Sequence, residues 1–446
     1  MARLSDDLKD ENHREAQALA GLARSLAAAR ADLQPTAVEV EAMAGAALAC
    51  GAPIEIERGF DAAARRLRAG WLKSVAAETA RVLRSPTEHD IERLARARHD
   101  AYGYERDFQP ESLEARCQAF FGEAPPGWSV AHVMFSSGQA ALATILLQLA
   151  AARPGKLTVA HVGAYFETGE LVGRACRRTP DLAQADCIIV EPIACNGRFT
   201  THDPVCIAGA LGDGQALLVD ETLTAPATRL PAILAEAAEQ DCIVMRLVSG
   251  LKLLQQGLEL ANVGIVSVFA RDADRAASFA DGLKGCRTLT GAGLRFVEAL
   301  ALEAPFFLDP GATSAYADRV FAHNASLARA VAAENRLFKP LGPDAAAQAA
   351  PYCAFELADG GGAAGLEALA LQIEQAAERR GLLFERGGSF GFRGHRFEVI
   401  EPENGDCPFL RIALGARDDH SRRGLVELMA ELASRPAGRA CGRSLR

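Results

Sequence analysis

Between residues 130 and 270 the sequence alternates short apolar runs with stretches of helical character. The apolar runs are VAHVMF, KLTVAHV, DCIIVEP, QALLVDE, DCIVMRLVS and NVGIVSVFA, and one helical stretch between them is GQAALATILLQLAAA. Each run is too short for a buried helix and has the length of a strand. Buried strands that alternate with helices predict an α/β domain with a mostly parallel central sheet.

The chain has 446 residues, which is too long for one simple core. The pattern of apolar residues along it predicts three parts. Residues 1–100 repeat apolar residues at helical spacing and predict a helical N-terminal extension. Residues 101–320 hold the α/β pattern of the large domain. Residues 321–446 mix strand-like and helical segments, which predicts a small C-terminal α+β domain.

The overall composition favours a cytoplasmic protein that acts on a small molecule. The net charge of -9 argues against nucleic acid and anionic membranes as partners. The charged N-terminus lacks the apolar core of a secretory signal, and no apolar run has the ~18 residues that a membrane span needs. The eleven cysteines lack metal-ligand spacing, so we expect reduced thiols and no metal site.

Polar residues follow several of the apolar runs, where open α/β sheets place their reactive groups. Ser137, Gly138 and Gln139 follow the first run and open a helix, so they fit either a phosphate site or an ordinary helix cap. Tyr165 follows the second run, where an aromatic ring can stack on a planar cofactor or belong to the core. Asp220 ends a later run and suits either a protonated pyridine nitrogen or a helix N-cap.

A lysine follows the very apolar run DCIVMRLVS. Lys252 stands in Ser249-Gly250-Leu251-Lys252, where partial desolvation lowers the pKa of the amine and makes it a usable nucleophile. Only six lysines occur in the chain, and the competitor, Lys284, follows a polar helix-like stretch. The order is therefore a phosphate loop, an aromatic residue, an aspartate and a Ser-x-x-Lys motif.

Several motifs together resemble the Cys/Met-metabolism family of pyridoxal 5'-phosphate (PLP) enzymes. Its S-S-G, Y-G-G-T, V-D-N-T and S-x-T-K motifs are similar to the segments that begin at Ser136, Tyr165, Val219 and Ser249. Its Y-S-R motif resembles Tyr104-Glu105-Arg106, its S-L-G resembles Ser389-Phe390-Gly391, and its R-L-S-V-G resembles the segment from Arg411 to Gly415. Asn196 echoes the asparagine of another family motif, and Leu251 replaces the family threonine.

The resemblance implies fold type I, the aspartate-aminotransferase-like fold, with PLP as cofactor and Lys252 as the residue that carries it. Lys252, Tyr165 and Asp220 would then be catalytic, and Arg411 and Ser389 would bind the substrate carboxylate. The cofactor would be held by Ser137, Gly138, Gln139, Tyr165, Asp220, Thr222, Ser249, Lys252, Tyr104, Arg106 and Asn196. Because Tyr104 and Arg106 reach the neighbour's phosphate in the family, a homodimer or homotetramer with shared sites is implied.

The expected reaction is β/γ-elimination or γ-replacement on an amino acid that carries a leaving group. The leaving group would be a thioether, an ester or a sulfonium such as that of S-adenosylmethionine, and a specialised biosynthetic role is a further expectation. Two alternatives remain open at this point. An aminotransferase needs the same lysine, aspartate and arginine, and a non-catalytic protein on this fold would use PLP structurally or as a sensed ligand.

Overall fold

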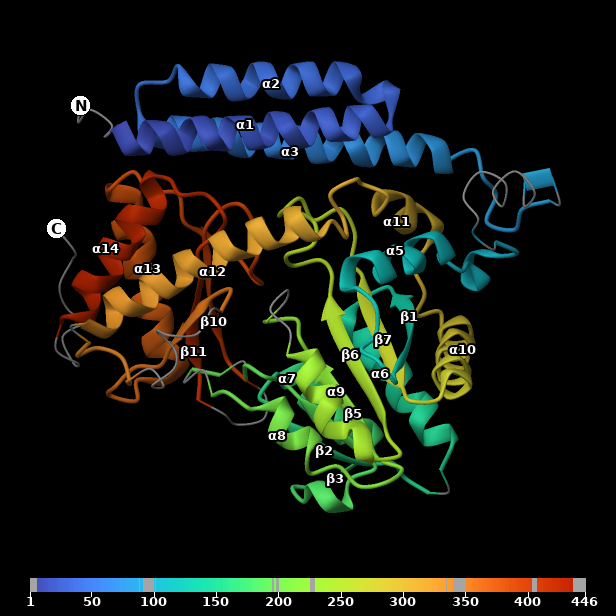
Figure 1. Cartoon of the computed structure of the whole chain (residues 1–446). Helices are drawn as coiled ribbons and strands as arrows, with labels where there is room; N and C mark the ends of the chain where they lie inside the picture. The colour runs from blue at the N-terminus through green and yellow to red at the C-terminus, as the bar shows by residue number, and fades with distance from the viewer. Residues whose placement is uncertain are drawn as a thin grey trace.

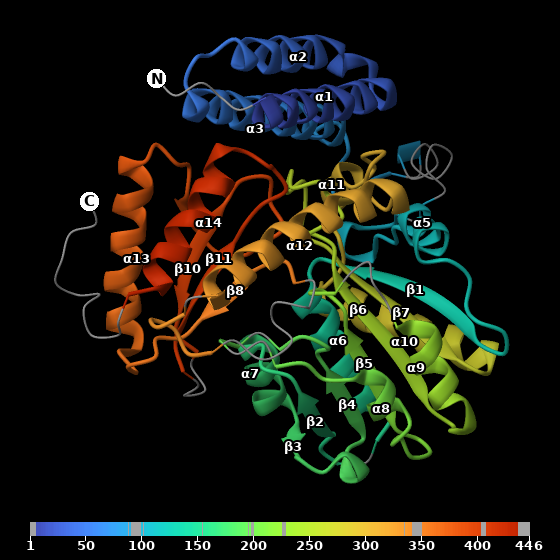
Figure 2. The same cartoon turned by 60° about the vertical axis from the view of Figure 1, so that its left-hand side comes forward.

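A computed structural model describes residues 6–87, 89–90, 100, 102–153, 155–194, 196–197, 200–224, 229–333, 335–340, 350–402 and 407–435. Figure 1 shows a bundle of N-terminal helices above two further parts, a large domain built on a sheet and a smaller C-terminal domain beside it. The view of Figure 2, turned by 60°, shows the same three parts. Within the described residues, no helix combines the length and apolar character needed to cross a membrane.

Three long helices form the N-terminal bundle: α1 (Asp6–Ala29), α2 (Gln34–Leu48) and α3 (Pro53–Thr79), with the short 3-10 helix η1 (Ala31–Leu33) before α2. Proline stands in the first turns of α2 and α3, where its missing N–H costs no helical hydrogen bond. These helices confirm the helical pattern expected for the N-terminal residues, of which 1–5, 88 and 91–99 lie outside the described part.

The bundle shares its core with the large domain. Phe60, Leu67 and Trp71 of α3 are buried in one hydrophobic cluster with residues that follow the central sheet, such as Leu300 and Phe307. The indole N–H of Trp71 donates a 2.8 Å hydrogen bond to the backbone carbonyl of Ala301. Because this apolar surface is buried against the large domain, the bundle is a part of the folded body and not a separate appendage.

The large domain contains a seven-stranded sheet in the order β1-β7-β6-β5-β4-β2-β3. Its strands are β1 (Ser129–Phe135), β2 (Thr158–Val162), β3 (Arg177–Arg178), β4 (Cys187–Val190), β5 (Ala216–Asp220), β6 (Ile243–Ser249) and β7 (Gly264–Ala270). Strands β3, β2, β4, β5 and β6 pair in parallel, whereas β7 is antiparallel to both β6 and β1. Because β7 is antiparallel to both of its neighbours, β1 and β6 run in the same direction. The predicted mostly parallel sheet is confirmed.

Helices pack around this sheet and connect it to the other parts (Figures 1 and 2). The helices of the large domain are α5 (Glu111–Phe121), α6 (Gly138–Ala151), α7 (Phe166–Ala175), α8 (Pro204–Ala208), α9 (Leu230–Glu236), α10 (Ala273–Thr290) and α11 (Phe296–Ala301), with the 3-10 helices η2 (Glu105–Asp107), η3 (Leu182–Gln184) and η4 (Ala237–Glu239). Strands β4, β5, β6 and β7 are largely buried, which explains why they read as continuous apolar runs in the sequence, whereas β1 is buried only in its last three residues.

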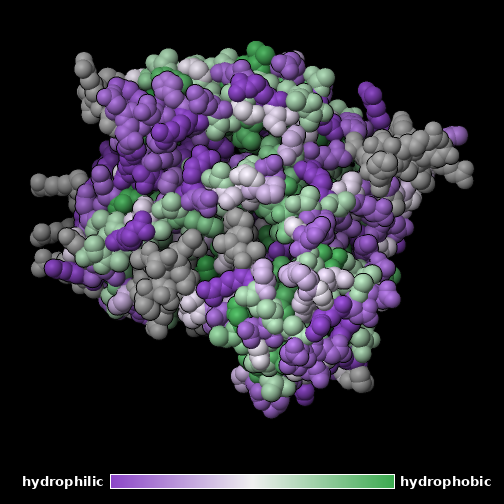
Figure 3. Space-filling model, in the orientation of Figure 1, coloured by the Kyte–Doolittle hydropathy of each residue, from purple (hydrophilic) through white to green (hydrophobic). Residues whose placement is uncertain are grey.

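The C-terminal domain has its own four-stranded sheet, in the order β8-β11-β10-β9. Its elements are α12 (Pro310–Ala333), β8 (Cys353–Phe355), α13 (Gly362–Arg379), β9 (Glu385–Arg386), β10 (Arg396–Ile400), β11 (Phe409–Ala413) and α14 (His420–Ala433). The boundary expected at residue 320 falls inside α12, so one continuous helix joins the two domains. In the space-filling view of Figure 3, hydrophilic residues cover much of the visible face and hydrophobic ones are scattered among them.

Buried polar contacts join the N-terminal bundle to the C-terminal domain. Arg393 forms an ion pair with Glu15 of α1, and both side chains are almost fully buried. Glu57 of α3 accepts hydrogen bonds from the backbone N–H and the hydroxyl of Ser421. Burial, together with the negative charge of Asp419, raises the pKa of Glu57 to about 8. The contact between the two parts is therefore most stable when Glu57 is protonated.

This shift predicts a pH-dependent stability. Because the pKa of Glu57 is higher in the folded protein than in the unfolded chain, its contribution is complete below the ordinary glutamate pKa of about 4.5 and is lost as pH rises from there to about 8. We expect Glu57→Gln, which keeps both contacts to Ser421 without a charge, to raise the melting temperature at pH 9 by a few degrees, to raise it less at pH 6, and to change it little near pH 4. Thermal unfolding across this range measures the effect. Glu55→Gln, at an exposed position of the same helix, is the control, and an equal response of both variants would refute the assignment.

Candidate active site

The carboxyl ends of the parallel strands meet at one edge of the central sheet, and polar residues follow each of them. Ser249 ends β6, and its backbone N–H donates a 3.0 Å hydrogen bond to the hydroxyl of Thr222, just after β5. A Cβ added to Gly138, at the start of α6, would lie 3.6 Å from the Cβ of Ser249. The segments after β1, β5 and β6, which are far apart in the sequence, are thus adjacent, and they bring together the Ser-Ser-Gly turn, Asp220 and the segment that leads to Lys252.

The Ser-Ser-Gly turn has the geometry of a helix start. Ser137 has extended backbone angles, and its hydroxyl accepts a 3.0 Å hydrogen bond from the N–H of Ala140 in the first turn of α6. Gly264 lies against this turn, where a Cβ would approach the carbonyl oxygen of Ser137 to 2.2 Å. Only glycine allows β7 to pack this closely. The helix-cap interpretation of the sequence is confirmed, and the unpaired N–H groups of a first helical turn are also the groups that bind anions.

Asp220 lies deep in the molecule at the end of β5, yet part of its surface stays open. Its carboxylate accepts a 2.9 Å hydrogen bond from the backbone N–H of Thr222. Burial raises the pKa of Asp220 to about 6, although the hydrogen bonds from Thr222 oppose the shift. Among the described residues no arginine or lysine forms an ion pair with Asp220. A cation placed beside this carboxylate would therefore be strongly favoured.

A second buried carboxylate, which the sequence analysis did not identify, holds the turn that carries Tyr165. Glu191 follows β4 and accepts 2.9 Å hydrogen bonds from the backbone N–H groups of Ala164 and Tyr165, while His161 lies 2.8 Å from its other oxygen. The hydroxyl of Tyr165 donates a 2.7 Å hydrogen bond to Glu167. The position of Glu191 at the end of a buried strand is the same signal that identified Asp220.

Lys252 is partly buried three residues after β6. Its amine donates a hydrogen bond to the hydroxyl of Ser389 and lies 5.3 Å from the centre of the Phe390 ring. Burial, and then the positive charge of Arg411, lowers the pKa of Lys252, as the sequence analysis expected for a nucleophilic amine. The competitor, Lys284, lies within α10 and is 3.6 Å from Asp281, away from the strand ends.

Arg411 and Ser389, the expected ligands of the substrate carboxylate, share a partner that the sequence did not reveal. Glu398 of β10 is directly opposite Arg411 of β11, and the two side chains form an ion pair. The same carboxylate oxygen accepts a 3.2 Å hydrogen bond from the backbone N–H of Ser389, which has a positive φ of 71°. The carboxylate of Glu398 thus contacts both Arg411 and the backbone of Ser389, whose hydroxyl accepts the hydrogen bond from the Lys252 amine.

The other expected cofactor ligands are not joined to this group. Tyr104 is 45% exposed and Arg106 is exposed as well, and within the described residues no hydrogen bond or ion pair connects them to Lys252 or Asp220. Asn196 instead forms side-chain hydrogen bonds of 3.0 and 3.2 Å with Thr200. Gln139 lies, partly buried, in the first turn of α6. Their roles as cofactor ligands remain predictions.

Comparison with known proteins identifies the fold. No protein-family model matches the chain, and no curated protein matches its sequence. Among solved structures, apo CalE6, a methionine gamma lyase from Micromonospora echinospora, is similar with 23% identity and a TM-score of 0.53, over 77% of this chain and 88% of that chain. The metB structure from Corynebacterium glutamicum has 19% identity and a TM-score of 0.57, over 74% and 87%. Cystathionine gamma-lyase from yeast has 18% identity and a TM-score of 0.54, over 75% and 88%.

These likenesses extend over about three quarters of the chain. They also agree with the motifs that resembled the Cys/Met-metabolism family in the sequence. The chain has the fold of these lyases, fold type I of the PLP-dependent enzymes, as the sequence predicted.

Proposed function

We propose that the chain is a PLP-dependent enzyme that performs β/γ-elimination or γ-replacement on an amino acid. The observation that carries the proposal is the adjacency of the N-terminus of α6 and the segments that carry Asp220 and Lys252, at one edge of the sheet. The residues present fit the cofactor. The carboxylate of Asp220 is buried and has no ion-pair partner among the described residues, so it could pair with a pyridinium nitrogen. The N–H groups in the first turn of α6 could bind the phosphate.

When bound, the cofactor would withdraw electrons from Cα of the substrate. Lys252 would carry it and, once released by the substrate amine, would act as the base at Cα and Cβ. Asp220 would keep the ring nitrogen protonated through its negative charge. Tyr165, held by Glu191 on the turn before α7, would stack on the ring and assist proton transfer.

Arg411 would bind the substrate carboxylate through a paired guanidinium–carboxylate contact. Because Arg411 also forms an ion pair with Glu398, the substrate carboxylate would compete with that of Glu398 for the guanidinium. Displacement of Glu398 would also break its hydrogen bond from the backbone N–H of Ser389. Ser389 would then be free to move, together with the hydroxyl that accepts the hydrogen bond from the Lys252 amine. Substrate binding and release of the Lys252 amine would thus be coupled through Glu398.

The expected substrate carries a thioether, an ester or a sulfonium such as that of S-adenosylmethionine as its leaving group. The likeness to a methionine gamma lyase and a cystathionine gamma-lyase supports the thioether class. We also propose a cytoplasmic location and a role in specialised biosynthesis.

Hydrogen exchange tests the reaction type. In D2O, a γ-eliminating enzyme should place deuterium at both Cα and Cβ of a substrate or an inert analogue, because its base must remove protons from both carbons. Proton NMR of a panel of amino acids measures the exchange. Exchange at Cα alone with release of the β-substituent would identify β-elimination, which is within the proposal. Exchange confined to Cα across the whole panel, with accumulation of pyridoxamine phosphate, would replace it with an aminotransferase.

We propose in addition that two chains share their active sites. Tyr104 and Arg106 are exposed and separate from the group around Lys252 of their own chain, which leaves them available to a neighbour. In the family that the sequence resembles, the corresponding residues reach the neighbour's phosphate. Each chain would then supply a phosphate ligand to the site of the other, in at least a twofold dimer.

Mixing two inactive variants tests the shared site. Lys252→Ala and Arg106→Ala chains should regain activity when they are mixed and allowed to exchange. About a quarter of wild-type activity is expected, because about half of the dimers are hybrids and one of the two sites in each hybrid is intact. The recovered rate measures the effect, with each variant alone as the control. A fully active monomer in sedimentation at the assay concentration would contradict the proposal.

A further inference from the structure

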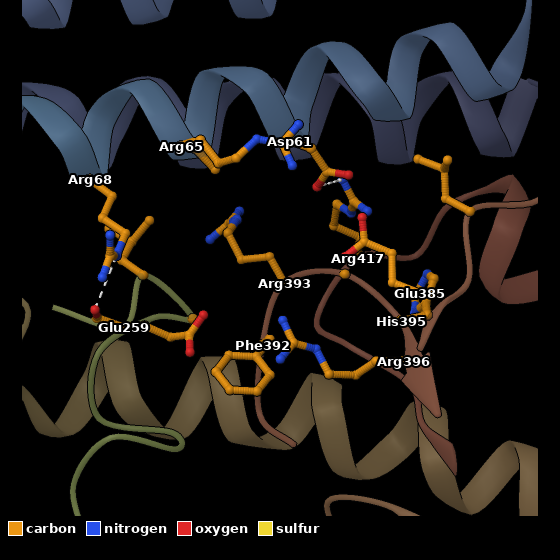
Figure 4. A pocket seen from close by; sticks show the side chains of 15 residues that line it. Asp61, Arg65, Arg68, Glu259, Glu385, Phe392, Arg393, His395, Arg396 and Arg417 are labelled. Carbon is orange, nitrogen blue, oxygen red and sulfur yellow. Dashed lines mark hydrogen bonds and ion pairs between the residues drawn. The ribbon is translucent and has the colours of Figure 1, made fainter. Parts of the chain in front are cut away.

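A cavity lies apart from the candidate active site. It has a volume of about 190 Å³ and is formed between α3, the segment Gly257–Glu259 and the segment Phe392–Arg396 (Figure 4). None of the strand-end residues around Lys252 and Asp220 lines it. The wall segment that starts at Gly257 begins five residues after Lys252, and the one that starts at Phe392 begins three residues after Ser389. Both are therefore continuous with segments of the candidate active site.

Two of the arginines in the wall already have carboxylate partners. Arg393 is paired with Glu15 and is almost fully buried. Arg417 is paired with Asp61 of α3 and is also almost fully buried. These pairs hold the bundle and the C-terminal domain together, and they make the walls of the cavity rigid.

Five other charged groups line the cavity without an ion-pair partner among the described residues: Arg65, Arg68, Arg396, Glu259 and Glu385. Arg65 and Arg68 are three residues apart on α3 and therefore lie on one face of that helix. The side chain of Arg68 donates a 3.1 Å hydrogen bond to the backbone carbonyl of Glu259. Figure 4 shows Arg65, Arg396 and Glu259 around the same hollow.

The guanidinium of Arg396 is oriented before any ligand arrives. It lies 3.7 Å from the centre of the Phe392 ring and donates a hydrogen bond to the backbone carbonyl of Gly388. Stacking on an aromatic ring holds the planar group in place with its remaining N–H groups available, which is the arrangement that binds a carboxylate.

Both signs of charge face the cavity, and this decides the class of ligand. A polyanion would be repelled by Glu259 and Glu385, and a cation would be repelled by the three arginines. A molecule with one carboxylate and one ammonium group meets complementary charges from both sets. A volume of about 190 Å³ has room for a single amino acid.

We infer that this cavity is a second binding site for a free amino acid, separate from the candidate active site. The carboxylate of the ligand binds Arg65 and Arg396, and its ammonium group binds Glu259. The N-terminal bundle supplies Arg65, so the site exists only where α3 packs on the two following domains.

Binding measurements on the full-length protein test the inference, with and without PLP. The probes are the standard amino acids, their methyl esters, their N-acetyl derivatives and inorganic phosphate, measured by titration calorimetry. At least one amino acid should bind the PLP-free protein, and its ester and N-acetyl forms should bind at least roughly tenfold more weakly. The site does not depend on the cofactor, so its failure and the failure of the proposed function are separate results.

Variants locate the bound amino acid. Arg65→Gln and Glu259→Gln should each weaken binding by roughly tenfold. Arg58→Gln, at an exposed position of the same helix where the arginine pairs with Glu55, is the matched control and should leave binding unchanged. Arg411→Gln should also leave it unchanged. The inference is overturned if no amino acid binds the PLP-free protein, if phosphate binds in its place, or if binding is lost in Arg411→Gln and retained in Arg65→Gln.

Discussion

Lys252→Ala is expected to abolish turnover. The lysine would carry the cofactor and then act as the base, and alanine can do neither. The wild-type protein should be yellow, and borohydride should attach PLP covalently to the peptide that contains Lys252. Mass spectrometry of the digested protein identifies that peptide, and a coupled assay for the released keto acid measures turnover. The variant should still bind PLP weakly through the contacts to its phosphate and ring.

Lys284→Ala is the matched control, because Lys284 lies within α10 beside Asp281 and away from the strand ends. We expect it to keep the colour, the labelling at Lys252 and the activity. Covalent labelling at Lys284 in the wild-type protein would contradict the assignment of the cofactor lysine.

Asp220→Asn is expected to reduce kcat by roughly a thousandfold, in the range of electrostatic contributions to catalysis. Asparagine preserves the shape of the side chain and can still accept the hydrogen bond from the N–H of Thr222. It removes only the negative charge that would keep the pyridine nitrogen protonated, so the loss measures this charge and not the packing. Steady-state kinetics measures kcat, and the absorption spectrum shows whether PLP still binds.

An exposed aspartate gives the control for Asp220. Asp203 caps α8 through a 3.0 Å hydrogen bond to the N–H of Val205 and lies on the surface. Asp203→Asn should leave kcat almost unchanged. Near-normal activity in Asp220→Asn would mean that Asp220 serves only as a cap for the turn that contains Thr222.

The sequence by itself was sufficient to predict the strands of the large domain and the polar residues that follow them. Strands that are buried on both faces appear as apolar runs, and the polar residue after each run marks the strand end, because both depend on neighbours in the chain. Ser137, Asp220 and Lys252 were predicted in this way, and the structure places their segments at one edge of the sheet. The order of the motifs then pointed to fold type I, which the likeness to solved structures confirms.

Features that depend on the pairing of distant segments were decided only by the tertiary structure. The antiparallel insertion of β7 between β1 and β6 has no signal in the sequence, since an apolar run does not reveal the direction of its partner. The ion pair between Glu398 and Arg411 depends on the register of β10 on β11, and a shift by one residue would turn Glu398 to the other face.

The packing of the N-terminal bundle is of the same kind. An amphipathic helix shows which face it buries but not the surface that covers it. The contacts of Trp71 with the backbone of Ala301, and of Glu15 with Arg393, join residues that are hundreds of positions apart. The sequence thus determined the helices and strands and the polar residues at the strand ends. The tertiary structure determined that Glu398 pairs with Arg411, and it formed the charged cavity beside α3. The reason is physical: helix and strand patterns are set by neighbouring residues, whereas burial, register and charge pairing are set by residues that meet only after the chain has folded.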